Sequence, residues 1–133
     1  MTLEVQHALA SLFRAAEEFE GVAIHASSDE KEIPGDQPAL VVVCDTAESP
    51  VAGLYRATVQ VTLSTPCLLQ EGLETHRTLA TMLRQLLGDI AQLSTHLPAT
   101  LAYSGRYLSS WSDSREDERW ITTAELVIGV REI

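Results

Sequence analysis

The stretch from Gly53 to Leu93 constrains the fold most, because its hydrophobic period changes once within it. In Gly53–Thr65, apolar and polar residues alternate, which predicts a strand with one face on a core and the other toward water. After a break at Pro66–Gly72, apolar residues in Leu73–Leu93 recur at spacings of three and four, which predicts an amphipathic helix. The stretch therefore predicts a helix that lies on a sheet. The apolar members of the strand are Tyr55, Ala57, Val59, Val61 and Leu63.

The part of the chain before this stretch predicts a helix and two strands. Leu3–Phe19 carries apolar residues at helical spacing, and Gly21 follows where a helix end is expected. The short apolar piece Val22–Ala26 predicts an edge strand, and Ser27–Pro38 predicts an exposed acidic loop. Ala39–Cys44 is a continuous apolar run rich in β-branched residues, which predicts a central strand covered on both faces.

The remaining segments complete an α+β pattern. Asp45–Ala52 predicts a wide loop that joins two strands into a hairpin. Ala99–Tyr107 predicts a strand with a bulge or bend at Gly105. Trp120–Arg131 predicts a last strand whose even-numbered face is the more apolar. We expect one α+β domain over residues 1–133, with a mostly antiparallel sheet of about four to five strands and two main helices packed on one side.

Charge limits the partners of this chain. Its formal net charge of -10, from 9 Lys+Arg against 19 Asp+Glu, argues against affinity for nucleic acid or an anionic membrane. The cations are spread along the chain, and acidity of this kind more often reflects solubility than attraction for basic partners. No apolar run approaches the roughly 20 residues of a membrane span, and no signal peptide is recognised. We expect a soluble, intracellular protein.

The residues that bear chemistry do not form a recognisable site. No pair of histidines or cysteines has the spacing of a local metal site, and no cysteine or serine lies in a nucleophile motif. His76 is expected to be a hydrogen-bonded core or interface histidine, and both cysteines are expected to be free. We therefore predict no catalytic, metal-binding or cofactor-binding residue and no enzyme. The residues considered are His7, His25, His76, His96, Cys44 and Cys67.

The segment Trp111–Trp120 is the one local feature that ordinary surface does not account for. Both tryptophans of the chain bracket it, and Arg115 and Arg119 interrupt its acidic residues. One interpretation is a hairpin whose tryptophans pair across the strands at the base of a solvated tip. The other is an arm that contacts another protein, since aromatic and arginine residues are enriched at interfaces. The candidate interface residues are Trp111, Arg115, Arg119 and Trp120.

The element order resembles that of the tail terminator (tail completion) proteins of long-tailed bacteriophages, and more loosely that of head-tail joining proteins. The matching features are chain length, acidic balance, helix Leu3–Phe19, hairpin Ala39–Thr65, helix Leu73–Leu93 and a terminal strand pair with a long loop. No residue-level motif carries the resemblance, so no functional residue is transferred. The resemblance implies a structural protein without catalysis that forms a homo-oligomeric ring, commonly of six subunits. Such a ring lies between the tail-tube protein and the head connector in the virion tail, after assembly in the host cytoplasm.

Two other classes of function stay open at the level of sequence. The first is a small-molecule-binding or regulatory α+β module of a bacterial cell, with a pocket between sheet and helices. The second is a small enzyme whose site forms across subunits. Neighbouring genes separate these hypotheses, because capsid, portal and tail-tube genes favour the terminator and a metabolic operon favours the others.

Overall fold

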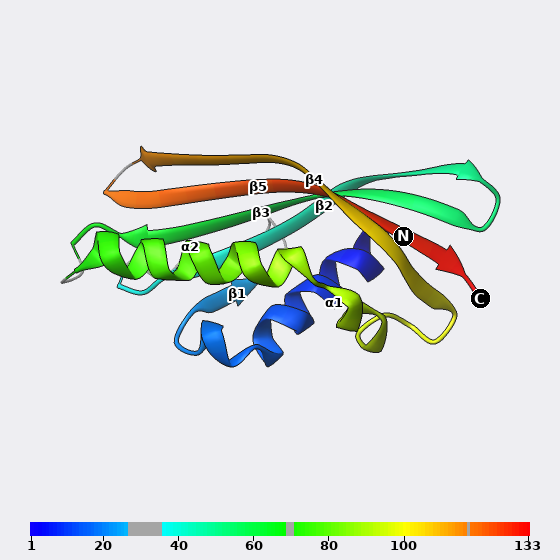
Figure 1. Ribbon diagram of the computed structural model, residues 1–133, viewed down its shortest axis with the longest axis horizontal. Coiled ribbons are helices and arrows are strands. Elements are labelled where there is room, and N and C mark those ends of the chain that lie inside the picture. Colours follow the sequence, from blue (N-terminus) through cyan, green and yellow to red (C-terminus); the bar gives the residue numbers. More distant parts are fainter. Residues whose placement is uncertain (27–35, 69–70, 117) are drawn as a thin grey trace.

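The computed structural model describes residues 1–26, 36–68, 71–116 and 118–133, and it is built on one five-stranded sheet (Figure 1). The strand order is β1-β2-β3-β5-β4, and every pair is antiparallel except β1 with β2. The expected α+β class, with a mostly antiparallel sheet and two main helices, is confirmed. Most of the acidic loop expected at Ser27–Pro38 lies outside the described residues. The elements are α1 (Thr2–Ala15), η1 (Glu17–Phe19), β1 (Ala23–His25), β2 (Ala39–Val51), β3 (Leu54–Pro66), α2 (Gly72–Gly88), η2 (Ala91–Thr95), β4 (Leu101–Glu116) and β5 (Arg119–Glu132).

One hydrophobic core lies between the sheet and both helices. The alternation along β3 and β5 sends one set of side chains to this core, as expected, and leaves the other set partly exposed. Tyr55 is an exception, because it is half-buried at the start of β3 and its hydroxyl donates to Glu132 at 2.7 Å. The fully buried members on the two strands are Ala57, Val59, Val61, Leu63, Ala124, Leu126, Ile128 and Val130.

Both helices end earlier than their hydrophobic periods predict. The chain is extended at Ala16 after α1, and Phe19 reaches the core from the short η1. The rings of Phe19 and Phe13 meet edge to face, with their centroids 5.7 Å apart. After α2, Asp89 is extended and its carboxylate accepts the N–H of Ala91, a local bond that stops the helix and starts η2. The periods continue past the helix ends because the 3-10 turns bury their own apolar residues in the same core. None of the described helices has the length and apolar character of a membrane-spanning segment.

The expected wide loop at Asp45–Ala52 is wrong, because β2 continues to Val51 and the turn to β3 is short. Gly53 makes this turn with a φ of 80°, a conformation that glycine adopts without strain. The whole segment Asp45–Val51 is exposed, so pairing with β3 holds it as a strand and burial does not. Ala39–Val41 lies inside the sheet between β1 and β3, but the expected cover on both faces of Ala39–Cys44 is incomplete, because the alternate residues Val41 and Val43 are half-buried.

The terminal hairpin is longer than expected. β4 runs through most of the predicted polar excursion, and Glu118, with a φ of 65°, lies at the tip. The predicted pairing of the two tryptophans is wrong: Trp111 lies opposite Ala124, and Trp120 lies opposite Arg115. The bulge expected at Gly105 is confirmed by a register shift between Tyr103 and Gly105.

The tips of the two long hairpins lie at opposite ends of the molecule, and the β2–β3 turn extends beyond the helices whereas the β4–β5 tip lies beside the start of α2 (Figure 1). β1 covers the outer edge of β2 only along Ala39–Val41, and Gln6 Oε1 accepts the backbone N–H of Cys44 at 2.8 Å where β2 leaves the core. On the other side of the sheet, Ser94 Oγ accepts the N–H of Tyr103 at 3.1 Å. Beyond these two points, no described strand pairs with the outer edge of β2 or β4.

Candidate functional site: a groove between α2 and the terminal hairpin

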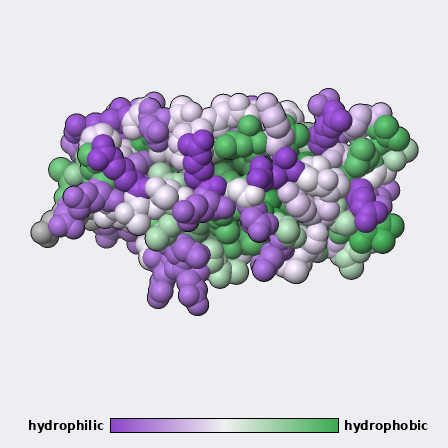
Figure 2. Space-filling model, in the orientation of Figure 1, coloured by the Kyte–Doolittle hydropathy of each residue, from purple (hydrophilic) through white to green (hydrophobic). Residues whose placement is uncertain are grey.

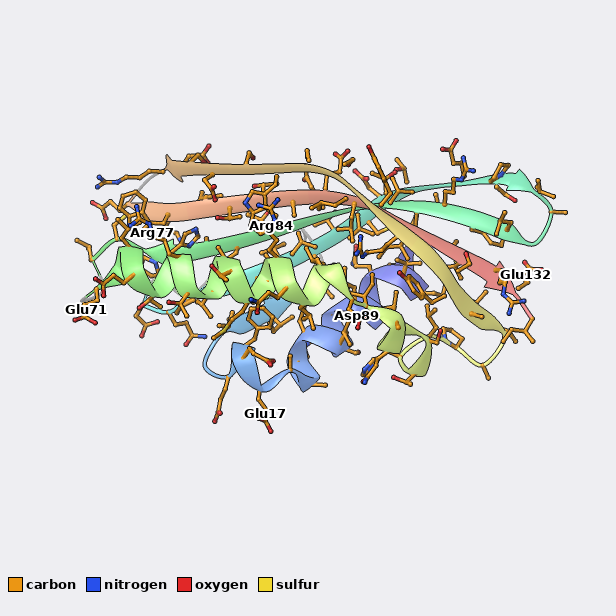
Figure 3. All side chains as sticks on the ribbon, in the orientation of Figure 1. Glu17, Glu71, Arg77, Arg84, Asp89 and Glu132 are labelled. Atoms are coloured by element: carbon orange, nitrogen blue, oxygen red, sulfur yellow. The ribbon has the colours of Figure 1, made fainter. Side chains whose placement is uncertain are left out.

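A groove of about 680 Å³ lies between α2 and the outer half of the β4–β5 hairpin. It exists because α2 packs on β3 and β5, whereas β4 lies one strand further out and no described helix covers its outer half. Figure 3 shows Arg77 and Arg84 extending from α2 on this side of the molecule. The lining residues are Leu73, His76, Arg77, Ala80, Thr81 and Arg84 of α2, Trp111, Asp113, Ser114 and Arg115 of β4, and Trp120 and Ile121 of β5.

Two arginine–tryptophan pairs form the walls of the groove. The guanidinium of Arg84 lies 5.2 Å from the ring centroid of Trp111, and that of Arg115 lies 5.2 Å from the ring centroid of Trp120. Each contact is a cation–π interaction that restricts the arginine side chain. A guanidinium has five N–H donors, so an arginine that lies over a ring can still donate to a carboxylate or a phosphate.

A chain of three hydrogen bonds, two buried and the last partly buried, forms the floor. Thr65 Oγ1 lies 2.9 Å from His76 Nδ1, His76 Nε2 lies 2.8 Å from Thr122 Oγ1, and Thr122 donates to Asp113 Oδ1 at 2.6 Å. Because Thr122 uses its hydrogen on the carboxylate, it accepts from His76, which fixes the imidazole with its proton on Nε2. Thr65 then donates to Nδ1. This chain joins α2 to β3, β5 and β4 in succession.

The same surroundings set the charge of His76. Burial lowers its pKa below the ordinary value of 6.5, and the carboxylate of Asp113 opposes that effect more weakly. The neutral imidazole is therefore the form that the floor holds at neutral pH, in agreement with the proton on Nε2. The sequence-based expectation of a hydrogen-bonded core histidine is confirmed.

The groove is a basic surface on an acidic protein. It contains three of the chain's 9 Lys+Arg residues and one of its 19 Asp+Glu residues. The remaining surface is consequently more acidic than the net charge of -10 suggests. The positive charge also comes from both walls, with Arg77 and Arg84 on α2 and Arg115 on β4. An acidic ligand in this groove meets guanidinium groups on two sides.

Three of the four candidate interface residues, Trp111, Arg115 and Trp120, come together in the groove. Arg119 does not line it. Its Nη2 donates to the carbonyls of Gln37 at 3.0 Å and Ser64 at 3.2 Å, and partial burial lowers its pKa. Arg119 therefore anchors the start of β5 to neighbouring backbone.

The contribution of α2 to the groove was missed at the level of sequence. Arg77 and Arg84 are seven positions apart, so they project from the same side of the helix, next to the apolar face that carries His76. That spacing is the signal in the sequence. The spacing gives no indication that this side of the helix meets the two tryptophans of the hairpin.

No protein-family model and no curated protein matches this sequence.

Proposed function

We propose that the protein is a structural virion protein of a phage or prophage: a tail terminator that forms a closed ring at the head-proximal end of the tail tube. One observation carries the proposal. Within the described residues, the sheet has two different open edges, the outer halves of β2 and β4, on its opposite sides. Exposed strand edges are templates for pairing with another chain.

Two unlike edges favour a ring over a two-fold dimer. If the outer half of β2 in one copy meets β4 of the next, the contact joins two different surfaces and leaves one of each free. Such head-to-tail contacts repeat until the rotation between subunits closes the ring. The order α1, β2–β3 hairpin, α2 and β4–β5 pair also agrees with the family resemblance seen in the sequence.

The experiment is size-exclusion chromatography with light scattering across a salt series, with and without tail tubes of the same phage or prophage. An acidic protomer repels its copies, so we expect the 14.5 kDa monomer at low salt and a ring as salt screens charges beyond about 10 Å. Electron microscopy should show one ring at a single end of each tube. A chain that stays monomeric at every salt concentration and leaves tube ends bare contradicts the proposal.

The groove favours a second candidate, a small-molecule-binding or regulatory module of a bacterial cell. Its volume of about 680 Å³ lies within the range of about 300–1,000 Å³ that is usual for ligand pockets. Thermal-shift measurements with a panel of carboxylates and phosphates test this alternative. Saturable binding at micromolar concentration together with a strict monomer supports it against the terminator.

A further inference from the structure

We propose that the groove receives an acidic segment of a second copy of this chain, the outer half of its β2 strand, Asp45–Val51. The inference rests on the proposed self-assembly and deepens it by naming the two surfaces that meet. In this contact the neighbour's strand lies along the outer half of β4, with its carboxylates on the arginines of the groove.

The spacing of the arginine–tryptophan pairs favours an extended polypeptide as the occupant. Trp111 and Arg115 are four residues apart on β4, which corresponds to about 13 Å of strand. A compact metabolite does not reach both pairs, whereas a strand of four or more residues does. Arginines on both walls then place guanidinium groups near the helix-side face of that strand.

Charge complementarity selects an acidic occupant, and this chain supplies one. The groove is basic while the rest of the molecule is strongly acidic, so a second copy is attracted to this surface more than to any other part of a like-charged neighbour. Carboxylates accept two parallel hydrogen bonds from a guanidinium, and the existing contact with tryptophan reduces the entropy that Arg84 and Arg115 lose on binding.

The segment Asp45–Val51 fits the groove in conformation, exposure and charge. It is already a strand, all of it is exposed, and its only charged residues are Asp45 and Glu48. Val51, with 63% of its surface exposed, adds an apolar side chain for a floor that contains Leu73 and Ile121. Figure 2 shows hydrophobic atoms beside hydrophilic ones at the end of the molecule where the β2–β3 turn lies.

A second exposed acidic segment fits the groove less well than Asp45–Val51. It contains Glu17, Glu18 and Glu20. These residues belong to or follow a 3-10 turn, and the one apolar residue among them, Phe19, is buried in the core of its own subunit. They therefore present charge without an extended backbone or a free apolar side chain. Their substitution gives a matched control.

The two surfaces lie at opposite ends of the long axis. Figure 3 places Arg77 toward one end and Arg84 nearer the middle. Glu132, whose backbone N–H donates to the carbonyl of Gly53 in the β2–β3 turn, lies at the other end. A copy that inserts its turn end into its neighbour's groove still presents an empty groove of its own. The contact is thus head to tail, as a ring requires.

Reciprocal charge reversal tests the contact by light scattering at the salt concentration where the wild-type ring forms. The groove variant Arg84→Glu/Arg115→Glu and the strand variant Asp45→Lys/Glu48→Lys should each weaken association by roughly 100-fold, because like charges then face each other. A chain with all four substitutions has the wild-type net charge and should form rings again. An equimolar mixture of the two variants should form alternating rings if the subunit number is even.

The decisive control combines Arg84→Glu/Arg115→Glu with Glu17→Lys/Glu18→Lys, which also restores the net charge but leaves the groove facing the wrong charge. We expect this chain to remain dissociated. If it associates as well as the four-substitution chain, or if neither double variant loses association, the inference is overturned while the ring stands. If the wild-type chain never associates, with or without tubes, the proposed function fails and the inference fails with it. Circular dichroism confirms that each variant is folded.

Discussion

His76 is the residue on which the groove floor depends, and its removal should destabilise the fold. The fully buried Thr65 hydroxyl donates to Nδ1, so His76→Leu leaves that donor without its acceptor. We expect the free energy of unfolding to fall by about 1–3 kcal/mol at neutral pH. Urea denaturation measures the change. Adding Thr65→Val should recover part of the loss, and a double variant no more stable than the single one contradicts this account of the floor.

His76 should also make stability depend on pH in one direction. Burial lowers its folded pKa below 6.5, so in the unfolded chain His76 gains a proton at a pH where the folded form is still neutral. Stability therefore falls as pH decreases below about 6.5, and this group has no effect above that value. Since His76→Leu lacks this contribution, its deficit against the wild type should shrink between about pH 7.5 and 5.5. A constant deficit would refute the assignment.

The two free cysteines should differ in reactivity. Burial, followed by the carboxylate of Asp45, raises the pKa of the Cys44 thiol to about 11, whereas Cys67 is only half-buried. Because the thiolate is the reactive form, we expect Ellman's reagent at about pH 8 to label Cys67 rapidly and Cys44 only after unfolding. Cys67→Ser should abolish the fast phase. Rapid labelling that survives in this variant would show that Cys44 is accessible.

At the level of elements, the start of α2 is fixed by a close approach that only glycine permits. A Cβ at Gly72 would lie 2.7 Å from the carbonyl oxygen of Pro66 at the end of β3, whereas a Cβ at Gly88 meets nothing within 4 Å. Gly72→Ala should therefore destabilise by about 1–3 kcal/mol despite the higher helix propensity of alanine. Gly88→Ala, the matched control, should be neutral or stabilising. Equal effects in chemical denaturation would contradict this explanation.

The sequence pattern predicted the elements that have a buried face. It missed the strand segments that are held only by hydrogen bonds to a neighbouring strand. β3 and α2 were recognisable because a buried face imposes a period of two or 3.6 on their residues. The outer halves of β2 and β4 have little buried surface, so nothing in Asp45–Val51 or in the residues after Leu108 marks them as strands. Their extended form comes from hydrogen bonds to β3 and β5.

The hairpin residues of the candidate site could be predicted from the sequence, but their contacts with α2 could not. Trp111, Arg115 and Trp120 were recognised from their residue types, which are enriched at interfaces. The contact of Arg84 with Trp111 joins residues from α2 and β4, which meet only because the strand order puts β4 outside β5. Residue type did not reveal that the guanidinium of Arg119 donates to backbone carbonyls and lies outside the groove.

For the whole molecule, the balance of charge predicts that duplex DNA is not bound. A net charge of -10 opposes the counterion release that drives non-specific binding, and the three arginines of the groove face a single hollow of the surface. We expect no mobility shift of a duplex at micromolar protein and about 150 mM salt. The four-substitution chain, which has the same net charge, is the control. A shift with the wild type that is lost in Arg84→Glu/Arg115→Glu would instead identify the groove as a nucleic-acid site.

In the proposed assembly, Gln6 and Ser94 would limit where a neighbour's strand can pair. An incoming strand would form ladder hydrogen bonds with β2 only outward of Cys44, along about 23 Å of backbone, because the Gln6 amide already holds the Cys44 N–H. Ser94 sets the corresponding limit at Tyr103 on β4. An edge of limited length allows few registers between the strands of two neighbouring copies. If every contact uses the same register, the angle between neighbouring subunits is the same around the assembly. Removing these two side-chain bonds would lengthen both edges and turn a closing assembly toward open fibres.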